Sequence, residues 1–319
     1  MNDEKLAPIR SEALKKLGQW LRSQDYSFTT VSPATHAAVL ANRSQAAAAN
    51  LRDVFGWSMP FADTLVPDPI RKYLSDAHLL ERAPSGLRSL VRFSSIGDRL
   101  FPHSAYPTVE NDAIFFGPDT YRFVRLVAEE LKRRPLLAGA RVLDTCCGSG
   151  AGGVMAAMLN PPSALELTLS DISKAAQPFA EASLALASLP NAQFIESDLF
   201  NSLEDEFDLI IANPPYLNDA TLRKYRHGGG QWGGSLSERI VDEGLERLTP
   251  RGRLVLYTGT AVSQGTDYLR NALHTRLNRS GCEWSYEEID PDVFGEEINT
   301  PTYSAVERIA AVGLVVHKR

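Results

Sequence analysis

The residues best suited to chemistry are Asn213-Pro214-Pro215-Tyr216, which follow the apolar run Phe207–Ala212. Two consecutive prolines fix the backbone and remove two N–H donors, so carbonyl oxygens can face a ligand without competing donors. The Asn213 side-chain oxygen and the Pro214 carbonyl can both accept from one NH2 group, while Tyr216 lies against the planar group that carries it. Such a clamp orients a nitrogen whose lone pair is delocalised and stabilises the charge that develops on it. The pattern favours methylation of an amide or a ring amine; the plainer alternative is a proline turn that ends a strand.

Three carboxylates follow successive apolar runs in the middle of the chain: Asp144, Asp171 and Asp198. Ligands of open α/β sheets bind at the carboxyl ends of the strands, and a carboxylate there can accept both hydroxyls of a ribose. Asp171 has the spacing for that role. Asp198 can accept from the exocyclic amine of an adenine while Leu199 covers the ring. Each acid alone is commonly a helix cap, but their recurrence after three strands favours a nucleoside site.

The first of these acids opens a glycine-rich turn with the pattern Asp144-x-Cys146-x-Gly148-x-Gly150. Glycines permit a tight turn and a close approach of the backbone to a ligand. The spacing differs from the G-x-G-x-x-G fingerprint of dinucleotide-binding folds. The plainer interpretation is a generic turn between a strand and a helix.

Together, D-x-C-x-G-x-G, the two later acids and N-P-P-Y resemble the class I S-adenosyl-L-methionine (SAM) methyltransferases, especially the HemK-type protein-glutamine methyltransferases that modify release factors. The resemblance covers roughly residues 112–319 by motif and is weaker for the first third of the chain. Cys146 replaces the first glycine of the family signature. The segment Phe116–Thr120 stands where the family has a proline-containing stretch that closes over the cofactor, but the usual arginine is absent.

This resemblance implies SAM as the cofactor and a role for each matching residue. The substrate nitrogen would be held by Asn213, Pro214 and Tyr216. The cofactor would be lined by Asp144, Cys146, Gly148, Gly150, Asp171, Ile172, Asp198, Leu199, Asn213 and Thr120.

Around these motifs, short apolar runs alternate with helical segments, which is typical of an α/β domain with a mostly parallel sheet. We expect a Rossmann-like methyltransferase domain with seven strands over residues 106–319, in which the last two strands pair antiparallel. A helix is expected over residues 119–134. The predicted strands are Arg141–Asp144, Glu166–Asp171, Gln193–Glu196, Asp208–Ala212, Arg253–Thr258, Trp284–Ile289 and Ile309–His317.

Residues 1–105 are expected to form a small accessory domain for substrate recognition, with helices over 5–23, 34–50 and 70–80. A β-hairpin is predicted from Arg88–Phe93 and Arg99–His103, joined by a turn that contains glycine. Helices followed by a hairpin also describe a winged helix, a fold that often binds nucleic acid. Both interpretations remain open at this point.

The composition is that of an ordinary globular protein, with 44% hydrophobic and 23% charged residues and a formal net charge of −6. The negative charge argues against a large nucleic-acid footprint. The three cysteines lack zinc spacing, so we expect no metal and reduced thiols. The sequence contains no signal-peptide pattern and no apolar run long enough to span a membrane, so we expect a cytoplasmic protein without a membrane partner.

A glycine-rich stretch, His227–Gly234, follows the N-P-P-Y motif and is expected to be a mobile substrate loop. Tyr225, Arg226 and His227 could contact substrate there, and the favoured alternative for His227 is a solvated loop histidine. The favoured function is methylation of a protein glutamine amide, with a peptide release factor as the partner. The alternative is methylation of an adenine or guanine amine in RNA or DNA. A non-catalytic SAM-binding module and a small-molecule methyltransferase are further possibilities, disfavoured because the N-P-P-Y motif is intact.

Overall fold

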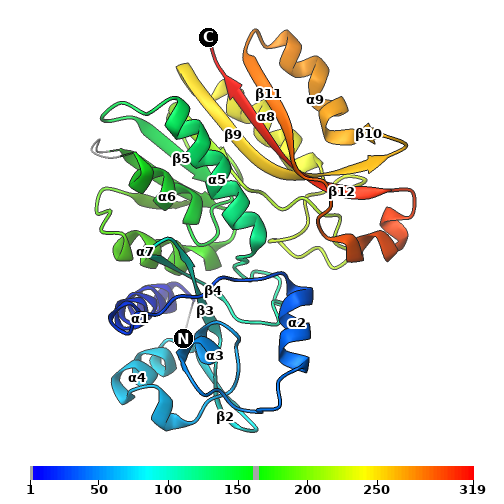
Figure 1. Cartoon of the computed structure of the whole chain (residues 1–319). Coiled ribbons are helices and arrows are strands. Elements are labelled where there is room, and N and C mark those ends of the chain that lie inside the picture. Colours follow the sequence, from blue (N-terminus) through cyan, green and yellow to red (C-terminus); the bar gives the residue numbers. More distant parts are fainter. Residues whose placement is uncertain (1–2, 161–164) are drawn as a thin grey trace.

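The computed structural model describes residues 3–160 and 165–319. It consists of a large α/β part, drawn in green to red in Figure 1, and a smaller N-terminal part, drawn in blue and cyan. The N-terminal part lies at one end of the α/β part, against the carboxyl ends of its parallel strands (Figure 1). None of the helices in the described ranges is both long and apolar enough to cross a membrane.

The α/β part is built on one sheet with the order β11-β12-β9-β8-β5-β6-β7, and a short strand β10 pairs with β9. The neighbouring pairs β9–β8, β8–β5, β5–β6 and β6–β7 are parallel. Strand β12 runs antiparallel to both of its neighbours, β11 and β9. The mostly parallel seven-stranded core that the sequence predicts is therefore confirmed, as is the antiparallel pairing of the last two strands. The strands are β5 (Arg141–Thr145), β6 (Glu166–Asp171), β7 (Gln193–Glu196), β8 (Phe207–Ala212), β9 (Leu248–Ser263), β10 (Thr266–Asp267), β11 (Glu283–Asp290) and β12 (Arg308–His317).

Helices cover both faces of this sheet because its central strands are apolar on both sides. In β5, Val142 belongs to the cluster packed under one set of helices and Leu143 to the cluster under the other set. The first set is α5 (Pro118–Arg133), α6 (Ala151–Leu159) and α7 (Gln177–Leu186), and the second is α8 (Ser235–Glu246) and α9 (Tyr268–Arg279). Short 3-10 turns are η1 (Asp63–Leu65), η2 (Lys174–Ala176), η3 (Gly295–Asn299) and η4 (Pro301–Tyr303).

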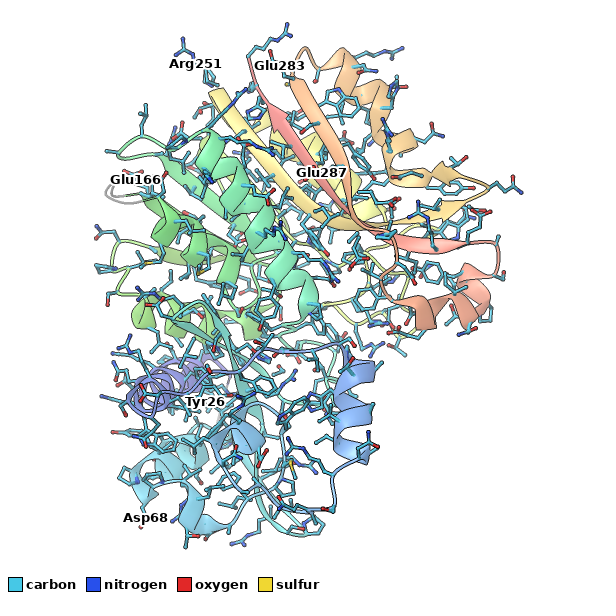
Figure 2. All side chains as sticks on the ribbon, viewed as in Figure 1. Tyr26, Asp68, Glu166, Arg251, Glu283 and Glu287 are labelled. Atoms are coloured by element: carbon cyan, nitrogen blue, oxygen red, sulfur yellow. The ribbon has the colours of Figure 1, made fainter. Side chains whose placement is uncertain are left out.

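The two ends of the parallel strands have different surroundings. Exposed charged side chains such as Glu166, Arg251 and Glu283 lie near the amino-terminal edge, at the top of Figure 2. The carboxyl edge points the other way, toward the N-terminal part. Parallel strands therefore bring their sequence-distant ends together at the edge where a ligand can bind.

The N-terminal part combines four helices with two hairpins: α1 (Asp3–Ser23), α2 (Pro33–Ala41), α3 (Leu51–Phe55), α4 (Asp68–Asp76), β1 (Leu80–Ala83) with β2 (Gly86–Ser89), and β3 (Val91–Ile96) with β4 (Arg99–Ser104). The single helix predicted over 34–50 is wrong, since α2 ends at Ala41. Asn50 starts a new helix by accepting a hydrogen bond from the Asp53 N–H, and Asp53 pairs with Arg43. These side-chain contacts outweigh the helical propensity of the alanines.

An apolar interface joins the N-terminal part to the α/β part. Helix α1 packs against α7, and a Cβ on Gly18 would stand 2.6 Å from a methyl carbon of Leu186. One hydrophobic cluster accordingly holds residues of α1, α3 and α4 together with Phe179 and Leu186 of α7. The Tyr121 hydroxyl also accepts a hydrogen bond from the Thr30 N–H at 3.0 Å. The division into domains at residue 105 stays a prediction.

Candidate functional site

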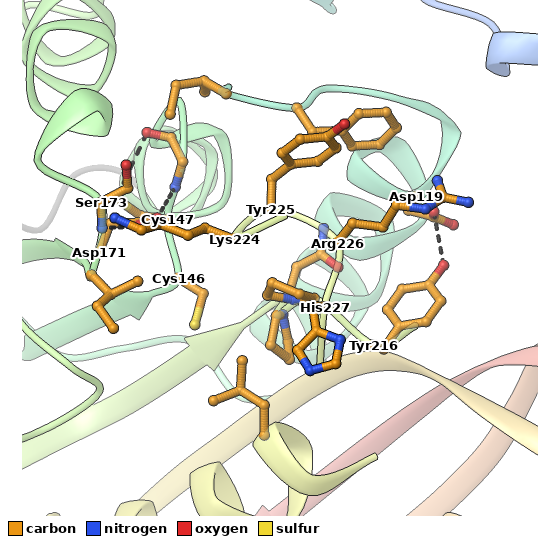
Figure 3. A pocket seen from close by; sticks show the side chains of 18 of the residues that line it. Asp119, Cys146, Cys147, Asp171, Ser173, Tyr216, Lys224, Tyr225, Arg226 and His227 are labelled. Atoms are coloured by element: carbon orange, nitrogen blue, oxygen red, sulfur yellow. Dashed lines mark hydrogen bonds between the residues drawn. The ribbon is translucent and has the colours of Figure 1, made fainter. Parts of the chain in front are cut away.

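A cavity of about 410 Å³ opens at the carboxyl edge of the sheet. Its walls come from the ends of β5, β6, β7 and β8, from residues 112–120, and from residues 222–227 (Figure 3). Most of the residues that the sequence singles out line it: Thr120, Asp144, Cys146, Gly148, Asp171, Ile172, Asp198, Leu199, Asn213, Pro214 and Tyr216. The volume is in the range of pockets that enclose a nucleoside-sized ligand.

The glycine-rich turn after β5 adopts left-handed backbone conformations at three positions. The φ angles of Cys146, Gly148 and Gly150 are 56°, 51° and 74°. Gly150 is required for a second reason, because a Cβ there would lie 2.7 Å from a Leu169 methyl carbon. Cys146 thus adopts the left-handed backbone conformation that favours glycine, and the turn forms although a cysteine occupies this position. Burial raises the pKa values of the Cys146 and Cys147 thiols, so both stay protonated.

Asp144 is the most deeply buried carboxylate of the cavity. It accepts a hydrogen bond of 2.7 Å from the Gly153 N–H at the start of α6. Burial, with a smaller contribution from the nearby Asp171, raises the pKa of Asp144 to about 7 in spite of this bond. A cation placed beside Asp144 would favour its ionised form.

Asp171 lies at the end of β6, where its two carboxylate oxygens accept from the Gly148 N–H at 2.9 Å and the Ser173 N–H at 2.8 Å. Burial raises its pKa, and these two bonds oppose the shift. Each carboxylate oxygen has a further lone pair that can serve the hydroxyls of a ribose. Ile172 is half-exposed beside it at the cavity mouth.

Asp198 and Leu199 follow β7, as the sequence predicts. The Asp198 carboxylate pairs with Arg239 of α8 at 3.3 Å, and both side chains are partly exposed. Leu199 is buried with a left-handed backbone, at a φ of 51°. Asp198 therefore lines the cavity and also forms an ion pair with a surface arginine.

The Asn213-Pro214-Pro215-Tyr216 turn forms the wall beyond β8. Its Tyr216 hydroxyl donates a hydrogen bond of 2.9 Å to Asp119. The Tyr216 ring lies against Gly259, where a Cβ would overlap it, and meets Phe294 edge to face at 5.8 Å between centroids. Burial, reinforced by Asp119, raises the pKa of Tyr216 well above its ordinary value. Tyr216 is thus a fixed, neutral wall of the cavity.

Comparison with known proteins agrees with this architecture. Residues 121–275 match the family model described as methyltransferase small domain. This part of the chain is therefore similar to the methyltransferase small domain family.

The relatives that the chain matches include two kinds of enzyme. A release factor glutamine methyltransferase of Deinococcus radiodurans is 33% identical over 194 residues, covering 56% of this chain and 63% of the relative. One from Lactococcus lactis is 28% identical over 158 residues, covering 46% and 56%. A ribosomal RNA small subunit methyltransferase C of Mannheimia succiniciproducens is 43% identical over 85 residues, covering 27% and 24%. The chain therefore matches well under the full length of these relatives.

The α/β part contains one organising residue to which the sequence gives no role of its own, Asp119. Besides the Tyr216 hydroxyl, Asp119 accepts from the Tyr257 hydroxyl at 2.6 Å and from Arg122 at 3.2 Å. It thereby connects the start of α5 to the N-P-P-Y turn and to β9. Next to it, Thr120 accepts from the Gly117 N–H at 3.3 Å, which fixes the segment over the cavity.

A stretch after the N-P-P-Y turn lines the cavity from the side of the linker before α5. The Tyr225 hydroxyl donates to the Thr108 carbonyl at 2.7 Å, and the Tyr225 ring stacks on Phe115. The Lys224 N–H donates to the Asn111 carbonyl at 3.0 Å. His227 lines the cavity and is half-buried, so it is only partly solvated. No pattern in the sequence predicts these contacts, because residues 224 and 225 bind to the linker before α5, 113 and 117 residues earlier in the chain.

Proposed function

We propose that this chain is a SAM-dependent N-methyltransferase whose acceptor is the side-chain amide of a protein glutamine. The observation that carries the proposal is the cavity itself, in which the carboxylates at the ends of β5 and β6 and just after β7 line the same space as the N-P-P-Y turn after β8. The first group of side chains suits a nucleoside cofactor, and the turn suits a planar NH2 group. The names of the relatives from Deinococcus radiodurans and Lactococcus lactis support a glutamine acceptor.

The residues of the cavity fit SAM. Asp171 has lone pairs free for the ribose hydroxyls, Asp198 can accept from the adenine amine, and Asp144 and the glycine turn can line the methionine part. When bound, SAM supplies a methyl group activated on a sulfonium sulfur. The protein's own contribution begins with Thr120 and its segment, which line the cavity and would shield a bound cofactor from water.

The substrate nitrogen is positioned by oxygens at the end of β8. The Asn213 side-chain oxygen and the Pro214 carbonyl accept its two hydrogens, so its lone pair points across the cavity. Preorganised acceptors of this kind stabilise the positive charge that develops on the nitrogen without reorganising during the reaction. Tyr216, fixed by Asp119, limits how the planar group can tilt.

Methylation of an RNA base amine is the second candidate, favoured by the match to a ribosomal RNA methyltransferase over 85 residues. Two observations support protein as the acceptor. The match to the Deinococcus radiodurans relative is longer, at 194 residues, and the net charge is −6. Binding to nucleic acid depends on neutralising phosphates, which an acidic protein does poorly unless it concentrates basic residues locally.

Transfer of a radiolabelled methyl group from SAM tests the proposal, with purified release factors and total RNA offered in parallel. We expect label in the release factor, mapped to one glutamine by mass spectrometry and absent when that glutamine is replaced. Label in RNA alone would replace the glutamine proposal by the second candidate. Absence of label from both acceptors, with SAM binding demonstrated, would contradict both.

A further inference from the structure

Lys224 lines the cavity from the stretch after the N-P-P-Y turn, and its backbone is anchored to the linker before α5. The Lys224 N–H donates to the Asn111 carbonyl at 3.0 Å and to the Asn111 side-chain oxygen at 3.3 Å. One residue later, the Tyr225 hydroxyl donates to the Thr108 carbonyl at 2.7 Å. These bonds fix the position from which the Lys224 side chain starts.

The Lys224 side chain runs from this anchor toward the end of β6. Figure 3 shows it extending toward Asp171 and Ser173. Burial raises the pKa of Asp171, and the positive charge of Lys224 opposes this rise, after the hydrogen bonds from the Ser173 and Gly148 N–H groups. Gly148 belongs to the glycine turn and donates to Asp171 at 2.9 Å. A charge that faces Asp171 is therefore also close to the glycine turn.

The ammonium group of Lys224 is available to a ligand. Within the part of the chain that the structure describes, three positively charged side chains line the cavity: Lys224, Arg226 and Arg239. Arg226 pairs with Glu297, and Arg239 pairs with Asp198 at 3.3 Å. Lys224 is exposed and forms no ion pair with any carboxylate of the described residues. It is thus the one cation of this lining whose charge is not already paired.

The other charges of the cavity make this cation necessary for SAM. Five carboxylates line the described part of the cavity: Asp112, Asp119, Asp144, Asp171 and Asp198. They suit the sulfonium and ammonium groups of SAM, which are positive, but they repel its carboxylate, which is its only anionic group. A carboxylate that leaves water needs a charged or hydrogen-bonding partner to offset the loss of hydration. A hydrogen bond from an ammonium to a carboxylate is among the strongest available.

We propose that Lys224 binds the carboxylate of the methionine part of the cofactor. The inference rests on the proposed SAM-dependent function and deepens it, because it assigns the anionic group of SAM to a residue outside the strand ends. The lysine ammonium is a point charge on a flexible four-carbon stem, so it can turn from Asp171 toward the carboxylate when the ribose occupies Asp171. Through Asn111, the same contact would connect the linker before α5 to the bound cofactor.

Two ligands that differ only in the carboxylate test this role without an acceptor and without turnover. They are S-adenosylhomocysteine and decarboxylated S-adenosylhomocysteine, each titrated by calorimetry. Lys224→Met keeps the length of the stem and removes the charge. We expect it to weaken binding of S-adenosylhomocysteine by about 5- to 20-fold, between the values for an exposed ion pair and for a hydrogen bond to a charged group. Its affinity for the decarboxylated ligand should stay within about twofold of wild type.

Two further variants serve as controls. Lys224→Arg keeps the charge and should retain most of the affinity for S-adenosylhomocysteine. Lys132→Met removes an exposed lysine in the last turn of α5 and should bind both ligands as the wild type does.

Three results for Lys224→Met would overturn the assignment. Equal weakening of both ligands would indicate a structural role, unchanged affinities would show that the ammonium does not meet the carboxylate, and tighter binding of S-adenosylhomocysteine would show that it only competes for Asp171. A wild-type protein that binds neither ligand would instead contradict the SAM-dependent function on which the inference rests. Failure to label any acceptor, with both ligands bound as expected, would contradict the proposed acceptors and leave the Lys224 contact confirmed.

Discussion

Asp119 is the residue whose removal should damage both the fold and the site. Its carboxylate accepts from the Tyr216 hydroxyl at 2.9 Å, from the Tyr257 hydroxyl at 2.6 Å and from Arg122 at 3.2 Å. Both tyrosines are buried, with 7% and 0% of their surfaces exposed. Asp119→Ala therefore leaves two hydroxyl groups in the interior without their acceptor.

The size of the effect follows from these contacts. A buried polar group left without a partner costs about 1–3 kcal/mol, so the two hydroxyls together cost about 2–6 kcal/mol. Arg122 adds at most about 1 kcal/mol, because its side chain is partly exposed and keeps Asp290 at 2.7 Å. Since a domain is stable by about 5–15 kcal/mol, the variant should fold but lose a large share of that margin.

Urea unfolding followed by circular dichroism measures the loss. Asp119→Asn keeps an oxygen acceptor in the same place and should lose less than Asp119→Ala. Tyr257→Phe removes one donor and leaves the carboxylate with its others, so it should lose about 1 kcal/mol. An Asp119→Ala protein within about 0.5 kcal/mol of wild type, the range of an ordinary surface substitution, would refute the reasoning.

Three other predictions concern the cavity. Asp171→Ala should weaken binding of S-adenosylhomocysteine by about 10- to 100-fold, as expected for lost hydrogen bonds to a charged group, and unchanged affinity in calorimetry would contradict the ribose assignment. Asn213→Ala should keep cofactor affinity within about twofold yet lower turnover at least about 100-fold; surviving turnover would refute the amine clamp. Because the pKa of Asp144 is raised to about 7, a cationic cofactor should lower it again and release protons on binding near pH 7. Calorimetry in buffers of different ionisation enthalpy measures this release, which should vanish in Asp144→Asn.

The sequence predicts the regular parts of the sheet well because their signals are local. The bounds of β6 and β7 are those expected from the apolar runs Glu166–Asp171 and Gln193–Glu196. In contrast, β9 spans Leu248–Ser263 where only Arg253–Thr258 is predicted. It pairs with β8 on one side and β12 on the other, and this pairing extends the strand through residues without a strong strand pattern. The hairpin β1–β2 was missed because its short strands are largely polar and half-exposed.

The candidate site divides in the same way. The sequence by itself determined the glycine turn, the carboxylates at the strand ends and the N-P-P-Y turn, since each is a contiguous motif next to an apolar strand. Only the tertiary structure decided where Asp119 and His227 lie relative to the cavity. Asp119 meets its tyrosine partners across 97 and 138 residues of chain, and His227 lines the cavity next to Gly228, whose backbone touches the N-P-P-Y turn. Such contacts depend on how distant segments pack, which no periodicity or spacing along the chain encodes.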